Sequence, residues 1–121
     1  MLQQLRDRAE HGWSTWYLVG RGPGEGLIGV CGFKGRPDAN GSVEISYSIL
    51  DSFRNDGYAS EAVHRLVDWA FGHARVRQVT AETMPHLRQS IRVLEKNGFR
   101  HAGKGSEYGV VRYVLERTRL A

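Results

Sequence analysis

The sequence has little cysteine, little proline and no long hydrophobic run, and each shortage excludes a class of protein. Its single cysteine, Cys31, allows neither an internal disulfide nor a paired-cysteine metal site. No apolar stretch approaches the roughly 18 residues that a membrane-spanning helix needs. Residues 1–10 are charged and polar, unlike the apolar segment of a secretory signal. We therefore expect a cytoplasmic protein that uses no metal and has no membrane partner.

Charge of one sign is in only modest excess. Lys and Arg number 17 against 13 Asp and Glu, which gives a net charge of +4 in 121 residues. Such an excess suits an anionic ligand, and it suits nucleic acid as well. The arginines are spread along the chain and form no stripe with interleaved aromatic residues, which favours a phosphate-bearing small molecule over nucleic acid. Length and composition predict a single domain over residues 1–121.

Hydrophobic periodicity predicts two helices set among short strands. Apolar and polar residues alternate strictly over residues 43–50, which is the period-two pattern of a half-buried strand. From Gly57 the period becomes helical, and Gly72 ends that segment. The other expected elements are a helix end at 1–11, strands at 13–19, 27–33, 76–83, 99–104 and 110–116, and a second helix at 87–97. This order predicts an α/β (α+β) fold, with a mixed sheet on which the helices pack.

The turn between the alternating strand and the first helix is the most informative segment. The first N–H groups of a helix lack internal partners, and the helix dipole adds partial positive charge, so backbone donors there can hold a diphosphate. Gly57 lets the chain bend sharply towards a ligand, and Arg54 can add a charge-assisted hydrogen bond. An ordinary strand-to-helix turn explains the same residues, and neither a P-loop nor a dinucleotide fingerprint is present.

Two segments carry motifs of a known family. Residues 43–63, VEISYSILDSFRNDGYASEAV, resemble the acetyl-CoA motif of the GNAT superfamily, [QR]-x-x-G-x-[GA], which Arg54, Gly57 and Ala59 match. Residues 90–99, SIRVLEKNGF, resemble a helix end typical of the branch of ribosomal-protein N-terminal acetyltransferases. Two motifs in this order are more specific than either alone, and the chain is thereby similar to an acetyl-CoA-dependent N-acetyltransferase.

The resemblance implies a mixed, mostly antiparallel central sheet with helices on both faces, and a strand pair that splays apart around the pantetheine arm. The residues implied to hold acetyl-CoA are Ile49, Leu50, Asp51, Arg54, Asn55, Asp56, Gly57, Tyr58, Ala59, Ser60, Ser90 and Asn97, with Lys96 nearby. The chain departs from the family at Leu87, which stands near the place where many relatives carry an asparagine. Relatives also begin with a strand and helices ahead of the first hairpin, so we expect a domain that lacks the usual first strand.

The implied reaction transfers an acetyl group from acetyl-CoA to a primary amine by direct attack in a ternary complex. It needs a neutral amine and a protonated leaving thiolate. Glu44 and Glu82 are the candidate general bases, although a solvated or ion-paired strand glutamate explains either residue. Some relatives use a tyrosine acid where this chain has Leu94, so Tyr108 or Ser90 would substitute; a plain surface aromatic also explains Tyr108.

Several alternatives stay open. The same fold without turnover would be an acyl-CoA-binding module that acts as a sensor or subunit. The acceptor amine can belong to a small molecule or a peptide. Trp13, Trp16 and Tyr17 are most simply core or edge residues, but they could also line an acceptor pocket or form a homodimer contact. Cys31 is expected to be a small buried hydrophobe.

Overall fold

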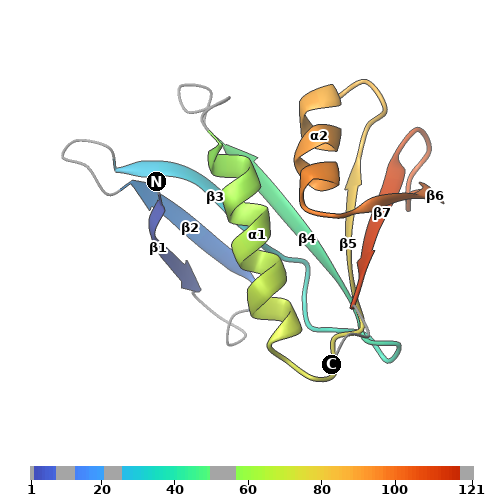
Figure 1. The fold of residues 1–121 in the computed structure, drawn as a ribbon, viewed down its shortest axis with the longest axis horizontal. Coiled ribbons are helices and arrows are strands. Elements are labelled where there is room, and N and C mark those ends of the chain that lie inside the picture. Colours follow the sequence, from blue (N-terminus) through green and yellow to red (C-terminus); the bar gives the residue numbers. More distant parts are fainter. Residues whose placement is uncertain (1, 8–12, 21–25, 50–56, 118–121) are drawn as a thin grey trace.

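A seven-stranded mixed sheet and two helices make up the computed structural model, which describes residues 2–7, 13–20, 26–49 and 57–117 (Figure 1). The strand order is β1-β2-β3-β4-β5-β7-β6, and every neighbouring pair is antiparallel except β4 and β5. This confirms the expected mixed, mostly antiparallel sheet. The elements are β1 (Leu2–Asp7), β2 (Thr15–Gly20), β3 (Leu27–Phe33), β4 (Ser42–Ile49), α1 (Tyr58–Phe71), β5 (Gln78–Thr83), α2 (Arg88–Lys96), β6 (Arg100–Lys104) and β7 (Val111–Glu116).

The prediction of a helix end at residues 1–11 is wrong. Residues 2–7 form strand β1, which pairs antiparallel with β2, with Leu5 opposite Leu18. Helical spacing of a few leucines is a weak local preference, whereas an open strand edge offers a row of backbone partners. The long-range pairing therefore decides the conformation, and a reading of residue spacing does not detect it.

Both helices cover the same face of the sheet, in front of it in Figure 1. Strands β4, β5 and β6 run parallel and follow one another in one direction across the sheet, so right-handed crossovers place α1 and α2 on one side. The side-chain amide of Asn97, just after α2, donates to the carbonyl oxygen of Ser60 in α1 at 3.3 Å. We expected helices on both faces, and the two helices of the described residues share one.

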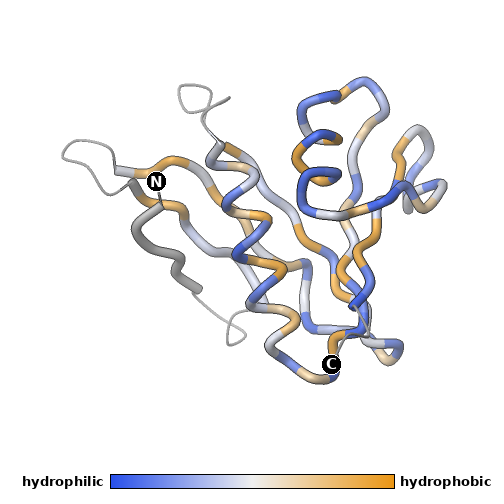
Figure 2. Tube along the Cα trace, viewed as in Figure 1, coloured by the Kyte–Doolittle hydropathy of each residue, from blue (hydrophilic) through white to orange (hydrophobic). Residues whose placement is uncertain are grey.

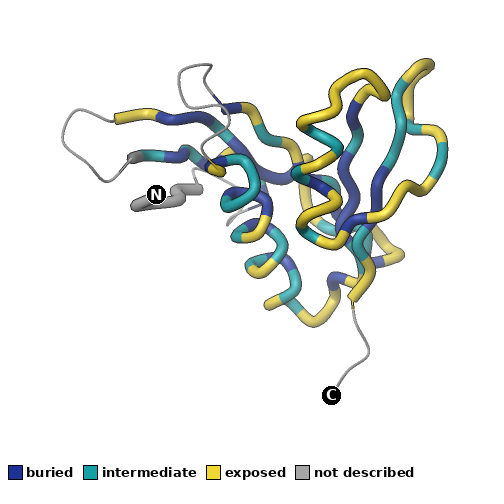
Figure 3. The backbone as a smooth tube through the Cα atoms, turned by 45° about the horizontal axis from the view of Figure 1, so that its top comes forward, coloured by how far each residue is buried: buried dark blue, intermediate teal, exposed yellow. Residues whose placement is uncertain are grey.

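The core lies between this pair of helices and the sheet. Figure 3 shows buried stretches along the strands of the sheet. The buried core side chains include Leu18, Ile28 and Ile45 of the strands, Leu66 of α1 and Leu94 of α2. Burial of each such side chain stabilises the fold by about 1.5–3 kcal/mol. The apolar alternation of β4 and the apolar stripe of α1 are therefore the features that fix which faces meet.

Trp13 and Trp16, near the N-terminal hairpin, belong to this core, whereas Tyr17 is only half-buried. Trp13 and Trp16 are 5% and 6% exposed, and the Trp13 and Trp69 rings meet edge to face with centroids 4.6 Å apart. Cys31 is buried, and that burial raises the pKa of its thiol to about 12. The thiol therefore stays protonated and packs as a small hydrophobe, which confirms the expectation.

The parallel pair β4 and β5 separates part of the way along its length. Its ladder runs from Ser42 opposite Gln78 to Ile45 opposite Ala81 and then ends. The rest of β4, residues 46–49, keeps its pairing with β3 but has no ladder partner on the side of β5. Figure 1 shows the two strands diverging upwards from this point, with α2 across the gap. The expected splay is thus present in the sheet.

Candidate active site

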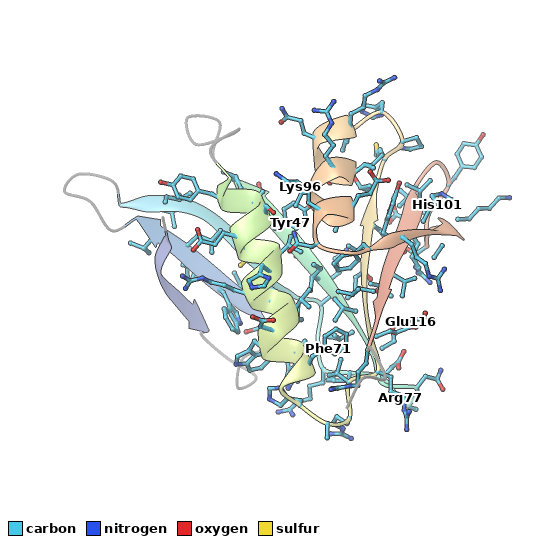
Figure 4. All side chains as sticks on the ribbon, in the orientation of Figure 1. Tyr47, Phe71, Arg77, Lys96, His101 and Glu116 are labelled. Atoms are coloured by element: carbon cyan, nitrogen blue, oxygen red, sulfur yellow. The ribbon has the colours of Figure 1, made fainter. Side chains whose placement is uncertain are left out.

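A cavity of about 640 Å³ lies where the end of β4, the start of α1 and one side of α2 come together. Its wall is formed by Tyr47, Ser48, Ile49, Gly57, Ala59, Ser60, His86, Leu87, Arg88, Gln89, Ser90, Arg92, Val93 and Lys96. Tyr47 and Lys96 are labelled in Figure 4, on either side of the space between β4 and α2. The cavity therefore borders the part of β4 that lies beyond its ladder with β5.

The first turn of α1 opens into this cavity. Gly57 stands at the helix start with φ 82°, and a Cβ placed there would meet no atom within 4 Å. The first helical hydrogen bond runs from Glu61 N–H to the Gly57 carbonyl at 3.0 Å. Helix geometry leaves the N–H groups before it without intrahelical acceptors, and they carry the positive end of the helix dipole. Gly57, Ala59 and Ser60 thus present backbone donors to an anion.

The opposite wall of the cavity is cationic. Arg88, Arg92 and Lys96 recur at every fourth residue of α2, so they share one side of the helix, and all three line the cavity. Figure 2 shows how hydrophilic this helix is beside the central strands. Among the described residues of the wall there is no Asp or Glu. The site is therefore electrostatically suited to a ligand with several negative charges.

Two of these cations were absent from our sequence predictions. Lys96 was expected near CoA, but Arg88 and Arg92 were not. The four-residue spacing of all three is visible in the sequence and identifies one side of the predicted second helix. That spacing was sufficient to predict that the three cations share one surface.

Asn97 uses its side chain to tie the two helices together. The amide nitrogen donates to the Ser60 hydroxyl at 3.2 Å and to the Val93 carbonyl at 2.9 Å, besides the Ser60 carbonyl. Asn97 does not line the cavity, whereas Ser60 and Ser90 do. The amide therefore holds the end of α2 against the first turn of α1, where the width of the cavity is set.

Tyr47 and Ser90 meet across the cavity. The Tyr47 hydroxyl lies 3.1 Å from Ser90 Oγ and donates to the Ser90 carbonyl oxygen at 3.3 Å. Burial raises the pKa of the Tyr47 phenol, and the hydrogen bond with Ser90 offsets only part of that rise. The phenol is therefore protonated throughout the neutral range. Sequence reasoning placed Tyr47 in the apolar row of its strand and missed its polar end.

Glu82 is the first β5 residue beyond the β4–β5 ladder, on the face of the sheet opposite the helices. Its carboxylate accepts bonds from Arg112 Nη2 at 2.7 Å, Ser106 Oγ at 2.7 Å and the Ser106 N–H at 2.9 Å. Burial raises the pKa of Glu82, but these hydrogen bonds and the Arg112 charge outweigh it, so the pKa is lowered overall. Glu82 is thus an ionised carboxylate that clamps the β6–β7 turn onto β5.

Glu44 lies on the same face of the sheet, opposite Thr80 and just before the ladder ends. Lys34 Nζ lies 3.2 Å from its carboxylate, and the side chain of Glu44 is a quarter exposed. Lys34 and Glu44 line a second, smaller cavity of about 250 Å³. Glu44 and Glu82, the two candidate bases, therefore lie next to the point where β4 and β5 separate. They are on the face of the sheet opposite the cationic cavity, and each is paired with a cation.

The remaining predicted site residues are Tyr108, Tyr58 and five residues that the structure does not describe. Tyr108, in the turn between β6 and β7, is completely exposed and lines neither cavity. Leu50, Asp51, Arg54, Asn55 and Asp56 lie outside the described residues. Tyr58, by contrast, is described: it is the first residue of α1, and its side chain is buried.

Comparison with known proteins places this chain in a family. The sequence matches the family "Acetyltransferase (GNAT) domain" over residues 1–100, and the chain therefore belongs to that family. It is 34% identical over 104 residues to the uncharacterized N-acetyltransferase YjdG of Bacillus subtilis, which covers 86% of this chain and 61% of YjdG. The chain thus spans about three fifths of that relative.

Solved structures of the same fold include an acetyltransferase of the GNAT family from Bacillus anthracis. It has a TM-score of 0.71 and 24% identity, over 84% of this chain and 65% of that one. The self-immunity acetyltransferase MccE, in complex with acetyl-CoA and AMP, has a TM-score of 0.73 and 16% identity, over 85% of this chain and 60% of that one. At these identities the likeness concerns the fold.

The described residues offer neither a metal site nor a membrane-spanning helix. No group of three or more His, Cys, Asp or Glu side chains there is placed to hold a metal ion. In the same part of the chain, neither α1 nor α2 is long and apolar enough to cross a membrane.

Proposed function

We propose that the protein transfers an acetyl group from acetyl-CoA to a primary amine by direct attack in a ternary complex. The observation that carries this proposal is the cavity at the splay, in which Arg88, Arg92 and Lys96 face the N-terminus of α1 with no carboxylate on the described wall. CoA carries three phosphate groups, and cations and helix-start donors are what such groups bind.

The edge of β4 beyond its ladder with β5 supports the placement of the pantetheine arm. This arm contains amide groups, which can pair with the backbone of a strand edge as another strand would. Residues 46–49 have no ladder partner in β5, and Tyr47, Ser48 and Ile49 line the cavity. Ile49 and the undescribed Leu50 and Asp51 would supply the backbone bonds, and Arg54 through Ser60 would hold the diphosphate.

The two sides of the sheet, at the point where β4 and β5 separate, suit two substrates. The cationic cavity opens on the helix side, whereas Glu44 and Glu82 flank that point on the other side. A thioester held on one side and an amine arriving from the other would react by proximity, with one carboxylate accepting the amine proton directly or through water. Tyr108, which is exposed and lines neither cavity, has no step in this proposal.

Replacement of Glu82 by Gln is expected to lower turnover more than acetyl-CoA affinity. Gln keeps the shape of the side chain but cannot accept a proton. Because the pKa of Glu82 is lowered, the wild-type acid limb of the pH–rate profile is expected below the usual glutamate value of about 4.3. The measurement is kcat and KM against pH for both proteins, with Glu44→Gln alongside. Identical profiles for wild type and Glu82→Gln would leave Glu44 or solvent as the acceptor.

Several broader expectations stay predictions. Residues 90–99 resemble the branch of ribosomal-protein N-terminal acetyltransferases, so a peptide N-terminus is one candidate acceptor and a small-molecule amine is another. A cytoplasmic location and a homodimer are proposed on the sequence alone. Sedimentation at high protein concentration checks the homodimer, and a monomer there would count against it.

Thermal unfolding with acetyl-CoA, CoA and ATP tests the proposed donor. A ligand at 100 times its Kd stabilises the folded state by about 2.7 kcal/mol, which shifts Tm by several degrees in a domain of this size. We expect stabilisation by acetyl-CoA and CoA and none by ATP. No shift with any of them contradicts the proposal. Binding without acetylation of any amine would indicate the alternative, an acyl-CoA-binding module that acts as a sensor or subunit.

A further inference from the structure

The hydroxyls of Tyr47 and Ser90 are two polar groups of the cavity wall that phosphate binding does not explain. They meet at 3.1 Å, and Tyr47 belongs to the part of β4 beyond the ladder with β5. If the pantetheine arm follows that edge, the side chain of Tyr47 lies beside its reactive end. A hydroxyl pair at that place can bind or move a proton.

We propose that the Tyr47 phenol donates its proton to the sulfur that leaves during acetyl transfer, an inference that rests on the proposed function. A free thiol has an ordinary pKa of about 8.5, so a proton donor at the sulfur favours cleavage at neutral pH. The C–N bond forms as the C–S bond breaks, and the phenol proton moves to sulfur. The amine proton goes to a carboxylate or water, and water returns a proton to Tyr47.

The surroundings of Tyr47 fit a donor. The Ser90 hydroxyl can donate to the phenol oxygen, which leaves the phenol proton for a different acceptor. The competing bond to the Ser90 carbonyl is long, at 3.3 Å, and is readily exchanged for one to a thiolate. Burial keeps the phenol protonated, and Leu94, buried in the core, has no proton to give. Tyr47 is therefore the described tyrosine on the cavity wall that is equipped for this step.

The test replaces Tyr47 by Phe, which keeps the ring and removes the hydroxyl. We expect kcat to fall about 100-fold, the lower end of general acid effects, with KM for acetyl-CoA and Tm little changed. A second readout needs no turnover: ultraviolet titration of CoA bound to the protein. Loss of a donor to the thiolate should raise the pKa of the bound thiol by about one unit. Tyr113→Phe is the matched control, because Tyr113 is buried on β7 and outside the cavity wall.

The outcomes separate this inference from the proposed function. Wild-type protein that binds no CoA overturns both. Wild-type turnover together with an unchanged kcat and an unchanged thiol pKa in Tyr47→Phe overturns only the role of Tyr47. Parallel losses of Tm, CoA affinity and kcat would mean that Tyr47 only stabilises the packing of α2 against β4, and this also overturns the inference. A selective fall in kcat with a raised thiol pKa, absent in Tyr113→Phe, supports it.

Discussion

Replacement of Gly57 by Glu is expected to abolish acetyl-CoA binding while the protein stays folded. The residue begins α1 with φ 82°, and no atom lies within 4 Å of an added Cβ, so the new side chain meets open space. A left-handed conformation costs a non-glycine residue about 1–2 kcal/mol, which a folded domain tolerates. The new carboxylate, however, would stand where the diphosphate is proposed to bind. We expect Kd to rise at least about 100-fold, measured by calorimetry.

The structure supplies a matched control at Gly109. This glycine has φ 83°, an equally open position for a Cβ, and a place in the β6–β7 turn outside the cationic cavity. Gly109→Glu therefore imposes the same strain and the same charge elsewhere. It should lower Tm to a similar degree and leave acetyl-CoA affinity unchanged. Retained affinity in Gly57→Glu, or equal losses in both variants, would refute the assignment of this turn to phosphate.

Reversal of two cations of the cavity wall, in the double variant Arg92→Glu and Lys96→Glu, is expected to have the second large effect. Both side chains line the cavity, and the substitution would turn an attractive wall into a repulsive one. We expect acetyl-CoA affinity to fall about 100-fold at low salt, equivalent to about 2.8 kcal/mol. Because these side chains are exposed, salt should shrink the difference between variant and wild type.

The double variant Arg75→Glu and Arg77→Glu controls for net charge. Both pairs of substitutions change the charge of the chain from +4 to 0. Arg75 and Arg77 follow the end of α1, about 21 Å of helix away from its start, and Figure 4 shows Arg77 at the far end of the molecule from Lys96. Affinity of the control should stay close to wild type. Equal losses in both double variants would mean that overall charge, and not this wall, attracts the ligand.

The parts of the fold that local pattern determines were predictable from the sequence. The alternating residues of β4 and the apolar stripe of α1 were placed within a residue or two, since each pattern repeats with the period of its own element. The turn at Gly57 was likewise recognisable, because a glycine there serves a positive φ. The prediction of a helix end at residues 1–11 failed at the described residues 2–7, because the strand that pairs with them is contributed by another segment.

The chemistry of the candidate site was less predictable, because its partners lie far apart in the chain. Glu82 was identified as a candidate base, but the cation beside it, Arg112, is 30 residues away and arrives through the register of β5 with β7. Tyr47 and Ser90 are 43 residues apart and meet only because α2 crosses the splay. Such pairings depend on tertiary register, which a one-residue shift would change and which no local spacing encodes.

The short ladder between β4 and β5 divides the sheet into two halves. One half is β1 to β4 with α1, and the other is β5 to β7 with α2. The ladder that joins them extends only from Ser42 to Ile45 on β4. Beyond this ladder, the polar contacts between the two halves among the described residues include the bond from the Asn97 amide to Ser60 and the contact between the Tyr47 and Ser90 hydroxyls. The buried residues of both halves also form one hydrophobic core, which includes Leu66 of α1 and Leu94 of α2. A ligand that widened the opening would therefore have to separate apolar packing as well as these polar contacts.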